Sequence, residues 1–558
     1  MAKQAPRPQT KALISYPVFI LLLAPFLAGL FYEAFSAAAA LALLGGLCYF
    51  RKKNGKLVIR FSLTFQAVML LMAAYLIASF WAVDAAMNLL GIVKFLPLPL
   101  FLIACDQVGA EDKQKAFLLF PYSAALMTLL TFLLGLIPSL HIYFYVGVRL
   151  AGFFEYPNTF AIYLLLGIPC LLETKKWTVR EIVCMLILLA GILLSGSRAV
   201  LIILAIMVFI YIFRVKSKVT RIVLPSAVGL AVAAAVLYAL ISGNRETIGR
   251  ILTLSFESST MNGRLLYYFD AARTILTHPF GLGYMGYYFI QGSIQTGVYS
   301  IMHIHNDLLQ FMLDVGWIPV GVFIWALIRS FRKADFTRRM MLFLLCFHSL
   351  MDFDLQFAAM DLILLMLMDH EGKTRCTLRR SAPLLAGGAV LAVFCLYFGT
   401  AAGLYQYNQE AAAVKLFPGH TLAQLHMLTT DTDALAMDAR ADSILSHNQS
   451  ASLAWSAKAR VAYAKGNITQ MIEYKQKAIR LSKYSIDEYL DYADMLWGGK
   501  VKLEAKGDTA GVERCQEELH HIPIWIQETL DGTSVLGWRI YDKPELELPL
   551  EYAWLKEQ

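Results

Sequence analysis

Long apolar stretches separated by short polar connections dominate the first 405 residues of the chain. A helix needs roughly 20 apolar residues to cross a hydrocarbon core of about 30 Å. The pattern predicts thirteen such helices, near residues 14–31, 34–50, 61–81, 87–105, 116–138, 157–172, 179–195, 199–213, 222–242, 304–328, 338–351, 355–368 and 382–404. We therefore predict an all-α polytopic membrane bundle of about 12–13 transmembrane helices, followed by a soluble α-helical domain.

The composition agrees with this pattern. Of the 558 residues, 58% are hydrophobic and 16% are charged, and a soluble protein cannot bury so much apolar surface in one core. The first apolar stretch lacks a following small-residue cleavage site, so we expect a retained helix rather than a signal peptide. The eight cysteines have no metal-ligand spacing, and we expect no metal site from them.

Basic residues occur in every second connection. Cytoplasmic loops of membrane proteins are enriched in Lys and Arg. Lys3, Arg7 and Lys11 therefore favour a cytoplasmic N-terminus, and alternate counting places the C-terminal part outside the cell membrane. The basic connections are residues 51–56, 111–115, 173–181, 214–221, 329–339 and 371–380.

The composition changes near residue 405, so we expect a membrane domain at 1–405 and an extracytoplasmic helical domain at 406–558. The second part carries 16 Lys and Arg against 22 Asp and Glu, a net charge of −6, which leaves +14 for the first. Residues 452–481 resemble a tetratricopeptide unit, with a turn at Gly466 and a small residue, Ala478, where two helices must pack. An unspecified helical domain is the alternative, and either could bind proteins.

Arginines without lysines mark the predicted outer segments, which include the long loops 139–156 and 243–303. A guanidinium grips phosphate oxygens bidentately and stays charged, so this choice favours anion binding over bulk charge. Arg198 follows Ser-Gly-Ser at a tight turn between apolar stretches, where an ionisable group is costly unless it has a ligand. Its alternative role is to reach the lipid headgroups. The outer arginines are Arg149, Arg198, Arg245, Arg250, Arg264 and Arg273.

A second polar group stands at the outer end of the 304–328 stretch, in MHIHNDLLQ. His303, Asp307 and Asp314 would share one face of a helix, whereas His305, next to Asn306, would project from another. A neutral imidazole can accept a proton near pH 7, so His305 is the candidate general base. His348, Asp352 and Asp354 should lie nearby and either orient the imidazole or bridge helices. Lys94, in the outer half of its stretch, could contact the same anion or pair helices.

The motif order resembles the O-antigen ligase and O-antigen polymerase superfamily of bacterial membrane glycosyltransferases. The matching segments are RLAGFFEYPN (149–158), SGSRAVL (195–201), NGR…AARTILTHPFGLGY (262–284) and HIHNDLLQFMLDVGWIPVGVF (303–323). The GxGxxG spelling at 281–286 lacks a βαβ context, so we do not predict a dinucleotide site.

The resemblance implies a bacterial cell-membrane enzyme that transfers an oligosaccharide or polysaccharide from an undecaprenyl-diphosphate carrier to a glycan, lipid or protein acceptor. It implies that Arg198 and Arg264 hold the diphosphate, that His305 activates the acceptor hydroxyl, and that Arg149 and Lys94 assist. No cofactor, metal or nucleic acid is expected. The alternatives are a polymerase of lipid-linked repeat units, a flippase or permease for lipid-linked sugars, and a peptidoglycan glycosyltransferase of the shape and division group.

Overall fold

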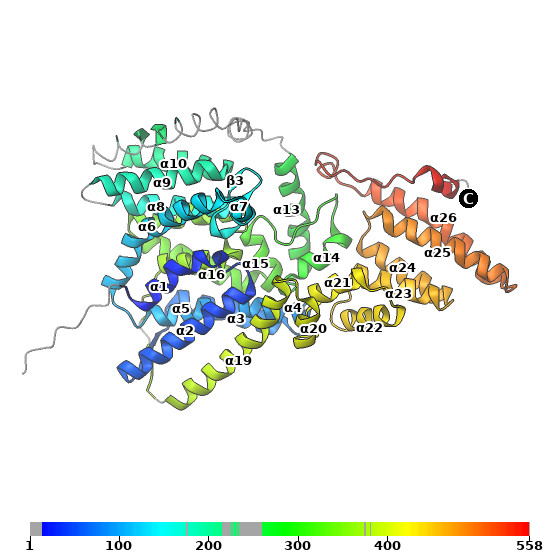
Figure 1. Cartoon of the computed structure of the whole chain (residues 1–558), viewed down its shortest axis with the longest axis horizontal. Helices are drawn as coiled ribbons and strands as arrows, with labels where there is room; N and C mark the ends of the chain where they lie inside the picture. Colours follow the sequence, from blue (N-terminus) through cyan, green and yellow to red (C-terminus); the bar gives the residue numbers. More distant parts are fainter. Residues whose placement is uncertain are drawn as a thin grey trace, which may run out of the picture.

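The protein is an all-α membrane protein with two short two-stranded sheets among its described residues. The computed structural model describes residues 14–173, 177–214, 259–372, 375–379 and 381–556, with a few residues between 222 and 233. Lys3, Arg7, Lys11, Arg245, Arg250 and most of the predicted helix at 222–242 lie outside these ranges. Figure 1 shows a bundle formed by the first part of the chain and a row of helices, coloured yellow to red, that extends from it.

The first part of the chain supplies the bundle. Its helices up to the undescribed region are α1 (Tyr16–Leu23), η1 (Ala24–Phe26), η2 (Ala28–Leu30), α2 (Glu33–Asn54), α3 (Leu63–Ala78), α4 (Ala85–Phe95), α5 (Pro97–Cys105), α6 (Ala110–Gly135), α7 (Pro138–Phe144), η3 (Gly152–Phe154), α8 (Pro157–Leu172), α9 (Val179–Ser195) and α10 (Arg198–Arg214). After that region come α13 (Ser259–Thr277), α14 (Gly286–Ile294), α15 (Asp307–Val315), α16 (Trp317–Lys333), α17 (Phe336–Ser349), η4 (Asp354–Gln356), α18 (Ala358–Leu367) and α19 (Ser381–Gln406).

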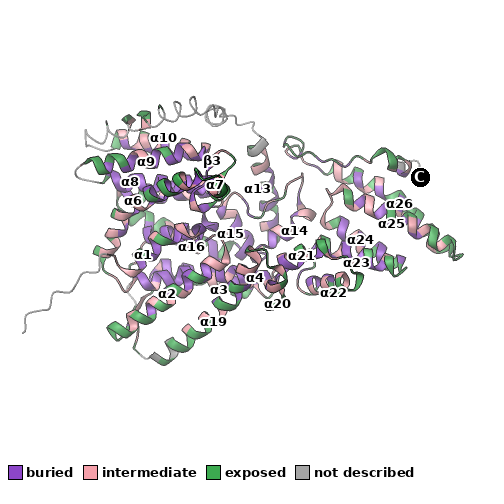
Figure 2. Cartoon of the chain, viewed as in Figure 1, coloured by how far each residue is buried: buried purple, intermediate pink, exposed green. Residues whose placement is uncertain are grey.

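The bundle has the exposure pattern of a lipid-embedded protein. Every residue of α8 except Asn158 is buried, which fits a helix that is apolar all round and surrounded by others. In contrast, α2 and α19 pack along one another and leave much of their surface exposed (Figure 2). The exposed side chains of α19 include Leu385, Val390 and Val393. Four described helices are long and apolar enough to cross a membrane, namely Glu33–Asn54, Ala85–Cys105, Ala110–Gly135 and Leu385–Gln406, and shorter apolar helices accompany them.

Three predicted continuous helices are interrupted. The stretch at 14–31 breaks into α1, η1 and η2, with Gly29 at φ 60°, and the stretch at 87–105 divides at Pro97 into α4 and α5. The stretch at 304–328 divides at Gly316 (φ 82°) into α15 and α16. A Cβ built on Gly316 would lie 2.3 Å from the carbonyl oxygen of Pro279, because the loop at 278–284 crosses the break. Glycine is required there for both the backbone conformation and the close approach.

The loop at 278–284 is fixed against α15 by its backbone. The amides of Leu282 and Gly283 donate to the carbonyl oxygens of Leu313 and Asp314, at 2.6 and 2.9 Å. A Cβ built on Gly281 would lie 2.4 Å from the Asp314 carbonyl oxygen. The glycines of HPFGLGY therefore serve a close packing of two chain segments, and this packing fixes the end of the helix that follows His305.

Some of the basic connections meet at one end of the bundle. Strand β1 (Leu57–Arg60) pairs with β4 (Arg375–Leu378) in an antiparallel sheet, and Lys333 bonds to Asp369 at 2.6 Å. At the other end, the predicted outer loop 139–156 forms α7, the strands β2 (Tyr145–Val146) and β3 (Arg149–Leu150), and η3. Among the described residues, the connections 51–56 and 329–339 are therefore each in contact with the connection 371–380, which the charge pattern assigns to the same side.

The C-terminal part is a series of helices that packs in successive pairs. Its elements are α20 (Glu410–Leu416), α21 (Thr421–Thr430), α22 (Ala434–Leu445), α23 (Ser452–Ala464), α24 (Ile468–Leu481), α25 (Ile486–Glu504), α26 (Thr509–Asp531) and η5 (Leu550–Lys556). The predicted helix–turn–helix at 452–481 corresponds to α23 and α24, with Gly466 at φ 74° in the turn and Asn467 capping α24. Lys475 of α24 is buried and bonds to Glu488 and Asp491 of α25.

Candidate active site

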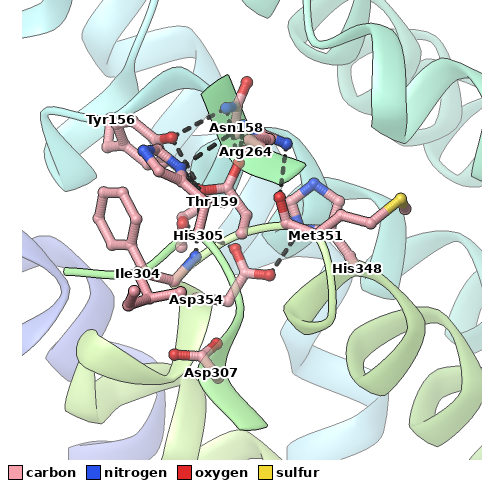
Figure 3. A network of polar contacts seen from close by, with 12 residues as sticks. Tyr156, Asn158, Thr159, Arg264, Ile304, His305, Asp307, His348, Met351 and Asp354 are labelled. Atoms are coloured by element: carbon pink, nitrogen blue, oxygen red, sulfur yellow. Dashed lines mark hydrogen bonds and ion pairs between the residues drawn. The ribbon is translucent and has the colours of Figure 1, made fainter. Parts of the chain in front are cut away.

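Polar side chains from four distant parts of the chain meet at the end of the bundle opposite the β1–β4 sheet. They come from the segment before and at the start of α8, from α13, from the irregular segment at 295–306, and from the connection between α17 and α18. Figure 3 shows these side chains converging around one loop. Asp352, in the last of these segments, is the residue that the other three contact.

His305 and Asp352 form a hydrogen-bonded pair. Nδ1 of the imidazole lies 2.9 Å from Oδ1 of the carboxylate. The Asp352 side chain is 1% exposed, whereas 23% of the His305 side chain is exposed. In the neutral form of the imidazole, Nδ1 then carries the hydrogen that the carboxylate accepts, and Nε2 keeps its lone pair. Among the described residues Nε2 has no hydrogen-bond partner, so this nitrogen is available to accept a proton from a bound molecule.

Asp352 is held as a carboxylate by several donors. The Tyr156 hydroxyl and the Asn158 amide each donate to it at 2.8 Å, and its own neighbour, the Phe353 amide, donates at 3.0 Å. Burial by itself raises the pKa of Asp352, but the hydrogen bond from His305 and the charge of Arg264 outweigh burial and hold the pKa below its usual range. The carboxylate is therefore ionised at neutral pH and orients the imidazole.

Arg264 reaches the same carboxylate from α13. Its guanidinium donates to the carbonyl oxygen of Met351 at 2.5 Å and to Oδ2 of Asp352 at 3.3 Å. One of its nitrogens also lies 3.5 Å from Nδ1 of His305. That contact is not a hydrogen bond when Nδ1 carries a hydrogen, because a guanidinium only donates. It places a positive charge beside the imidazole.

Arg149 joins the Ser-Gly-Ser-Arg turn to this network. Its Nε donates to the carbonyl oxygen of Ser195 at 2.7 Å, and its NH2 group donates to Oδ1 of Asn158 at 2.6 Å. Asn158 in turn donates to Asp352, so a continuous chain of hydrogen bonds links the turn to His305. Arg198 begins α10 directly after this turn and is half-buried. The structure thus brings the segments of Arg149, Arg198, Arg264 and His305 together.

The prediction that His303, Asp307 and Asp314 share a helical face is wrong for His303. Helix α15 begins at Asp307, because the Asn306 side chain accepts from the Leu309 amide at 3.1 Å and caps it. His303 precedes the helix, is 5% exposed and packs against the rings of Phe31 and Phe353.

Both ring nitrogens of His303 are buried without a partner among the described residues. Burial, followed by the neighbouring charges of Lys94 and His305, lowers the pKa of His303 well below its usual value, so this imidazole is neutral. Of the two candidate histidines, only His305 is paired with a carboxylate and partly exposed.

The backbone around His305 is fixed by its own set of bonds. The Gln310 side chain accepts from the Ile304 amide at 2.8 Å and donates to Asp314 at 2.9 Å. Asp314 also accepts from the Tyr75 hydroxyl at 2.8 Å, which connects α15 to α3. The Tyr268 hydroxyl donates to the carbonyl oxygen of His305. Asp314 therefore supports the turn from beneath rather than facing the exposed imidazole.

His348 does not orient His305. Its Nδ1 lies 2.5 Å from Oδ2 of Asp354, and the Thr159 hydroxyl donates to the other oxygen at 2.7 Å. This buried group connects α17, η4 and α8. Of the two roles expected for His348 and Asp354, the structure therefore fits the bridging of helices. Asp307 accepts from the Leu355 amide at 2.8 Å and so fixes the same connection.

Lys94 belongs to a separate buried network. It donates to the Tyr284 hydroxyl at 3.2 Å and lies 4.6 Å from the Phe31 ring centre, and Tyr284 donates to Glu33 at 2.6 Å. These contacts connect α4, the loop before α14 and α2, so the helix-pairing reading of Lys94 fits the structure. The described residues contain no group of three or more His, Cys, Asp or Glu that could hold a metal ion.

Sequence reasoning missed Tyr156, Asn158, Tyr268 and Gln310. Asn158 and Tyr156 stand in the RLAGFFEYPN motif, and Asn158 is the one residue of α8 that is not buried. A polar residue at the start of an otherwise apolar helix was a signal that could have found it. Tyr268 and Gln310 gave no such signal, because tyrosines and glutamines are common near membrane interfaces.

A family model described as O-antigen ligase matches residues 183–326. The match runs from α9 to α16 and includes Arg198, Arg264 and His305, whereas Arg149 and Asp352 lie outside it. No curated protein and no solved structure matches the chain. The match supports the resemblance to the O-antigen ligase superfamily and, with the apolar helices, a membrane protein that transfers a glycan from a lipid-linked donor to an acceptor.

Proposed function

We propose that the chain, whose residues 183–326 match a family model described as O-antigen ligase, transfers an oligosaccharide or polysaccharide from undecaprenyl diphosphate to an acceptor hydroxyl. The observation that carries the proposal is the His305–Asp352 pair beside Arg264. A base with a free lone pair next to a fixed cation suits a reaction that removes a proton and releases an anion.

The proposed reaction uses this geometry. Nε2 of His305 takes the proton of the acceptor hydroxyl, and the oxygen attacks the anomeric carbon of the donor. The bond from that carbon to the diphosphate oxygen breaks, and undecaprenyl diphosphate leaves with the electron pair. Asp352 stays ionised and stabilises the imidazolium that forms. A single displacement of this kind inverts the configuration at the anomeric carbon.

Arg264 and Arg198 are the proposed diphosphate ligands. The Arg264 guanidinium is fixed beside His305, and the Arg264 side chain keeps 17% of its surface exposed. Cationic groups near the leaving oxygen stabilise the charge that develops as the bond breaks. Arg149 is fully engaged with Ser195 and Asn158, so its proposed role is to hold the turn that carries Arg198 and to hold Asn158 against Asp352.

An apolar cavity next to the site supports a lipid-linked donor. It has a volume of about 260 Å³ and lies between α3, α5, α15, α16, α17 and α18. Asp307, Leu308, Leu350 and Leu355 line the part of the cavity closest in sequence to His305 and Asp352. Its remaining lining is almost wholly aliphatic and aromatic, which matches the chemistry of a polyprenyl chain.

The proposed orientation places the site on the outer face of the cytoplasmic membrane. The basic connections 51–56, 329–339 and 371–380 meet near the β1–β4 sheet, which follows the end of α2. The site lies near the start of α2, where Tyr32 bonds to Glu155. An excess of Lys and Arg favours the cytoplasmic side, so the N-terminus is assigned inside and residues 406–558 outside. In this arrangement the donor is used after it has crossed the membrane.

The test is a transfer assay with the full chain in proteoliposomes. Undecaprenyl-diphosphate-linked glycan is supplied with candidate acceptors, and a glycan-bearing acceptor together with free undecaprenyl diphosphate is expected. Longer lipid-linked chains without any other acceptor would identify polymerisation. Movement of intact donor across the bilayer without cleavage would contradict the proposal and favour a flippase.

A further inference from the structure

The C-terminal helices contact the segment that leads to His305. Thr296, two residues after α14, accepts at its carbonyl oxygen from the Ser534 amide at 2.9 Å and from the Ser534 hydroxyl at 3.1 Å. Gly297 packs on Gly537, since a Cβ built on Gly297 would lie 2.6 Å from the Gly537 Cα. Residues 532–540, called here the C-terminal turn, therefore pack directly on the loop that follows α14. At Gly297 and Gly537 the two backbones are too close to admit a side chain.

The same loop is bound to α13 through Asp270, which is 2% exposed. Asp270 accepts from the amide and the hydroxyl of Thr296, both at 2.9 Å, and from the Tyr299 hydroxyl at 3.0 Å. Asp270 lies on the helix that carries Arg264 and Tyr268. Thr296 is thus held from one side by α13 and from the other by the C-terminal turn.

A second contact joins the C-terminal helices to the bundle. Asp84 is fully buried and caps α4 by accepting from the Met87 amide at 2.8 Å. The same carboxylate accepts from the Thr421 hydroxyl and, at 2.9 Å, from the Asn448 amide. Since α21 and the α22–α23 connection supply these donors, the C-terminal part is fixed at two separate places, and docking does not depend on the 295–299 loop alone.

The segment at 295–306 has no helix or strand of its own, so its conformation depends on such contacts. The Gln291 side chain accepts from the Ile301 amide at 3.0 Å, and Gln310 holds Ile304. Without the C-terminal turn, the Thr296 carbonyl oxygen and Gly297 would lose these contacts, and the start of the segment would keep its contacts with Asp270 and Leu266 of α13. Small displacements of a reacting group can lower a rate about 100-fold.

We propose that the C-terminal turn and Asp270 together position the His305 segment against α13, which makes Asp270 and Thr296 positioning residues and the helical part a required component of the site. This inference rests on the proposed function. It predicts that undocking the turn lowers the rate of transfer while the donor still binds, because no residue of the turn lines the apolar cavity.

The test uses the full chain in proteoliposomes with two variants. In Gly297→Val the new side chain would meet Gly537 of the turn and also Leu266 of α13. In Gly537→Val it would face the loop from the turn, since a Cβ built on Gly537 would lie 2.6 Å from the Thr296 carbonyl oxygen. We expect kcat to fall about 10- to 100-fold, with the donor KM changed less than about twofold, and faster hydrogen exchange in residues 296–306. Gly45→Val is the matched control, because a Cβ at Gly45 meets nothing within 4 Å. Asp270→Asn, which keeps the side-chain shape, should show the same kcat and KM pattern.

The outcomes separate this inference from the proposed function. Faster exchange in 296–306 with wild-type kcat in Gly297→Val would overturn the inference, while an inactive His305→Ala variant in the same preparation would leave the proposed function standing. A rise in KM with unchanged kcat would also overturn it, because the turn would then act on donor binding. Should Gly297→Val not insert, Gly537→Val tests the contact with the turn and Asp270→Asn tests the contact with α13.

Discussion

Nδ1 of His305 lies 2.9 Å from Oδ1 of Asp352, although 47 residues separate them in the chain. The contact fixes which nitrogen carries the hydrogen and which is left to accept one. It also explains why a buried aspartate is surrounded by donors from α8 and α13, since an ionised carboxylate in such a place requires them. The predictions below follow from this pair and from what surrounds it.

Replacing Asp352 with Asn should lower kcat by about 100- to 10,000-fold, the range contributed by a positioned general base. An amide at this position can turn its NH2 group toward Nδ1, which would favour the tautomer with the hydrogen on Nε2. The substitution also removes the negative charge that stabilises the imidazolium. The measurement is kcat for glycan transfer. Asp369→Asn, at the opposite end of the bundle beside Lys333, is the control and should keep wild-type kcat.

His303 should behave in the opposite way from His305. Replacing His303 with Leu removes two buried nitrogens that have no partner, so stability should rise by about 1–3 kcal/mol and transfer should persist. The measurements are the midpoint of thermal unfolding, for stability, and kcat, for transfer. Loss of transfer in His303→Leu, with His305 intact, would contradict the assignment of the general base to His305.

Stability should also depend on pH through His303. Its folded pKa lies well below its usual value because of burial, so the unfolded chain binds a proton that the folded chain does not. The wild-type protein should therefore lose stability as the pH falls below about 6.5, the unfolded value for histidine. His303→Leu should weaken this acid-side loss, as measured by thermal unfolding between pH 7.5 and 5. An identical pH dependence in both proteins would contradict the assignment.

Arg264 should matter more than other arginines of α13. Removing it in Arg264→Ala should reduce kcat/KM about 10- to 100-fold, since hydrogen bonds to charged groups contribute about 1.5–3 kcal/mol. Arg264→Lys should recover only part of the loss, because an ammonium group cannot form the planar fork. Arg273→Ala, on the same helix but exposed, is the control. Equal effects from both positions would indicate a general electrostatic contribution.

Filling the apolar cavity should impair use of long-chain donors. Leu71 lines the cavity, and Leu71→Trp should occupy much of the space available to a hydrocarbon chain. The donor KM should rise for undecaprenyl diphosphate-linked glycan and stay near wild type for a donor with a short prenyl chain. Leu76→Trp is the control, because Leu76 is 60% exposed on the same helix. An equal rise of KM for both donors would contradict the proposal that the cavity binds the prenyl chain.

The sequence predicted the helices better than their interruptions. Apolar stretches and basic connections located most described helices of the bundle, because the demand for roughly 20 apolar residues is a local property. They did not locate α7, α13 and α14, which lie in the predicted outer loops 139–156 and 243–303. The break at Gly316 had a local signal too, as Gly316 is followed by a proline at position 319. Its cause is not local, since the approach of Pro279 to Gly316 depends on how two distant segments pack.

The sequence indicated which residue types form the candidate site but not which of them are hydrogen-bonded to one another. His305 and Arg264 could be singled out by residue type and motif, but the partner of the imidazole could not. Asp352 and Asp354 stand two residues apart, and only the fold of the α17–α18 connection decides that the first meets His305 and the second meets His348. Lys94 likewise has a clear charge, but its neighbours Tyr284 and Glu33 come from distant elements.

The most direct test of the account is a single-turnover assay of undecaprenyl diphosphate release by purified protein with excess acceptor. Wild-type protein and His426→Ala, which alters an exposed histidine of the C-terminal part paired with Glu410, should release the carrier and form the glycosylated acceptor at the same rate. His305→Ala should bind the donor with unchanged affinity and release nothing over the same period. Release at the wild-type rate by His305→Ala would contradict the central claim that this imidazole removes the acceptor proton.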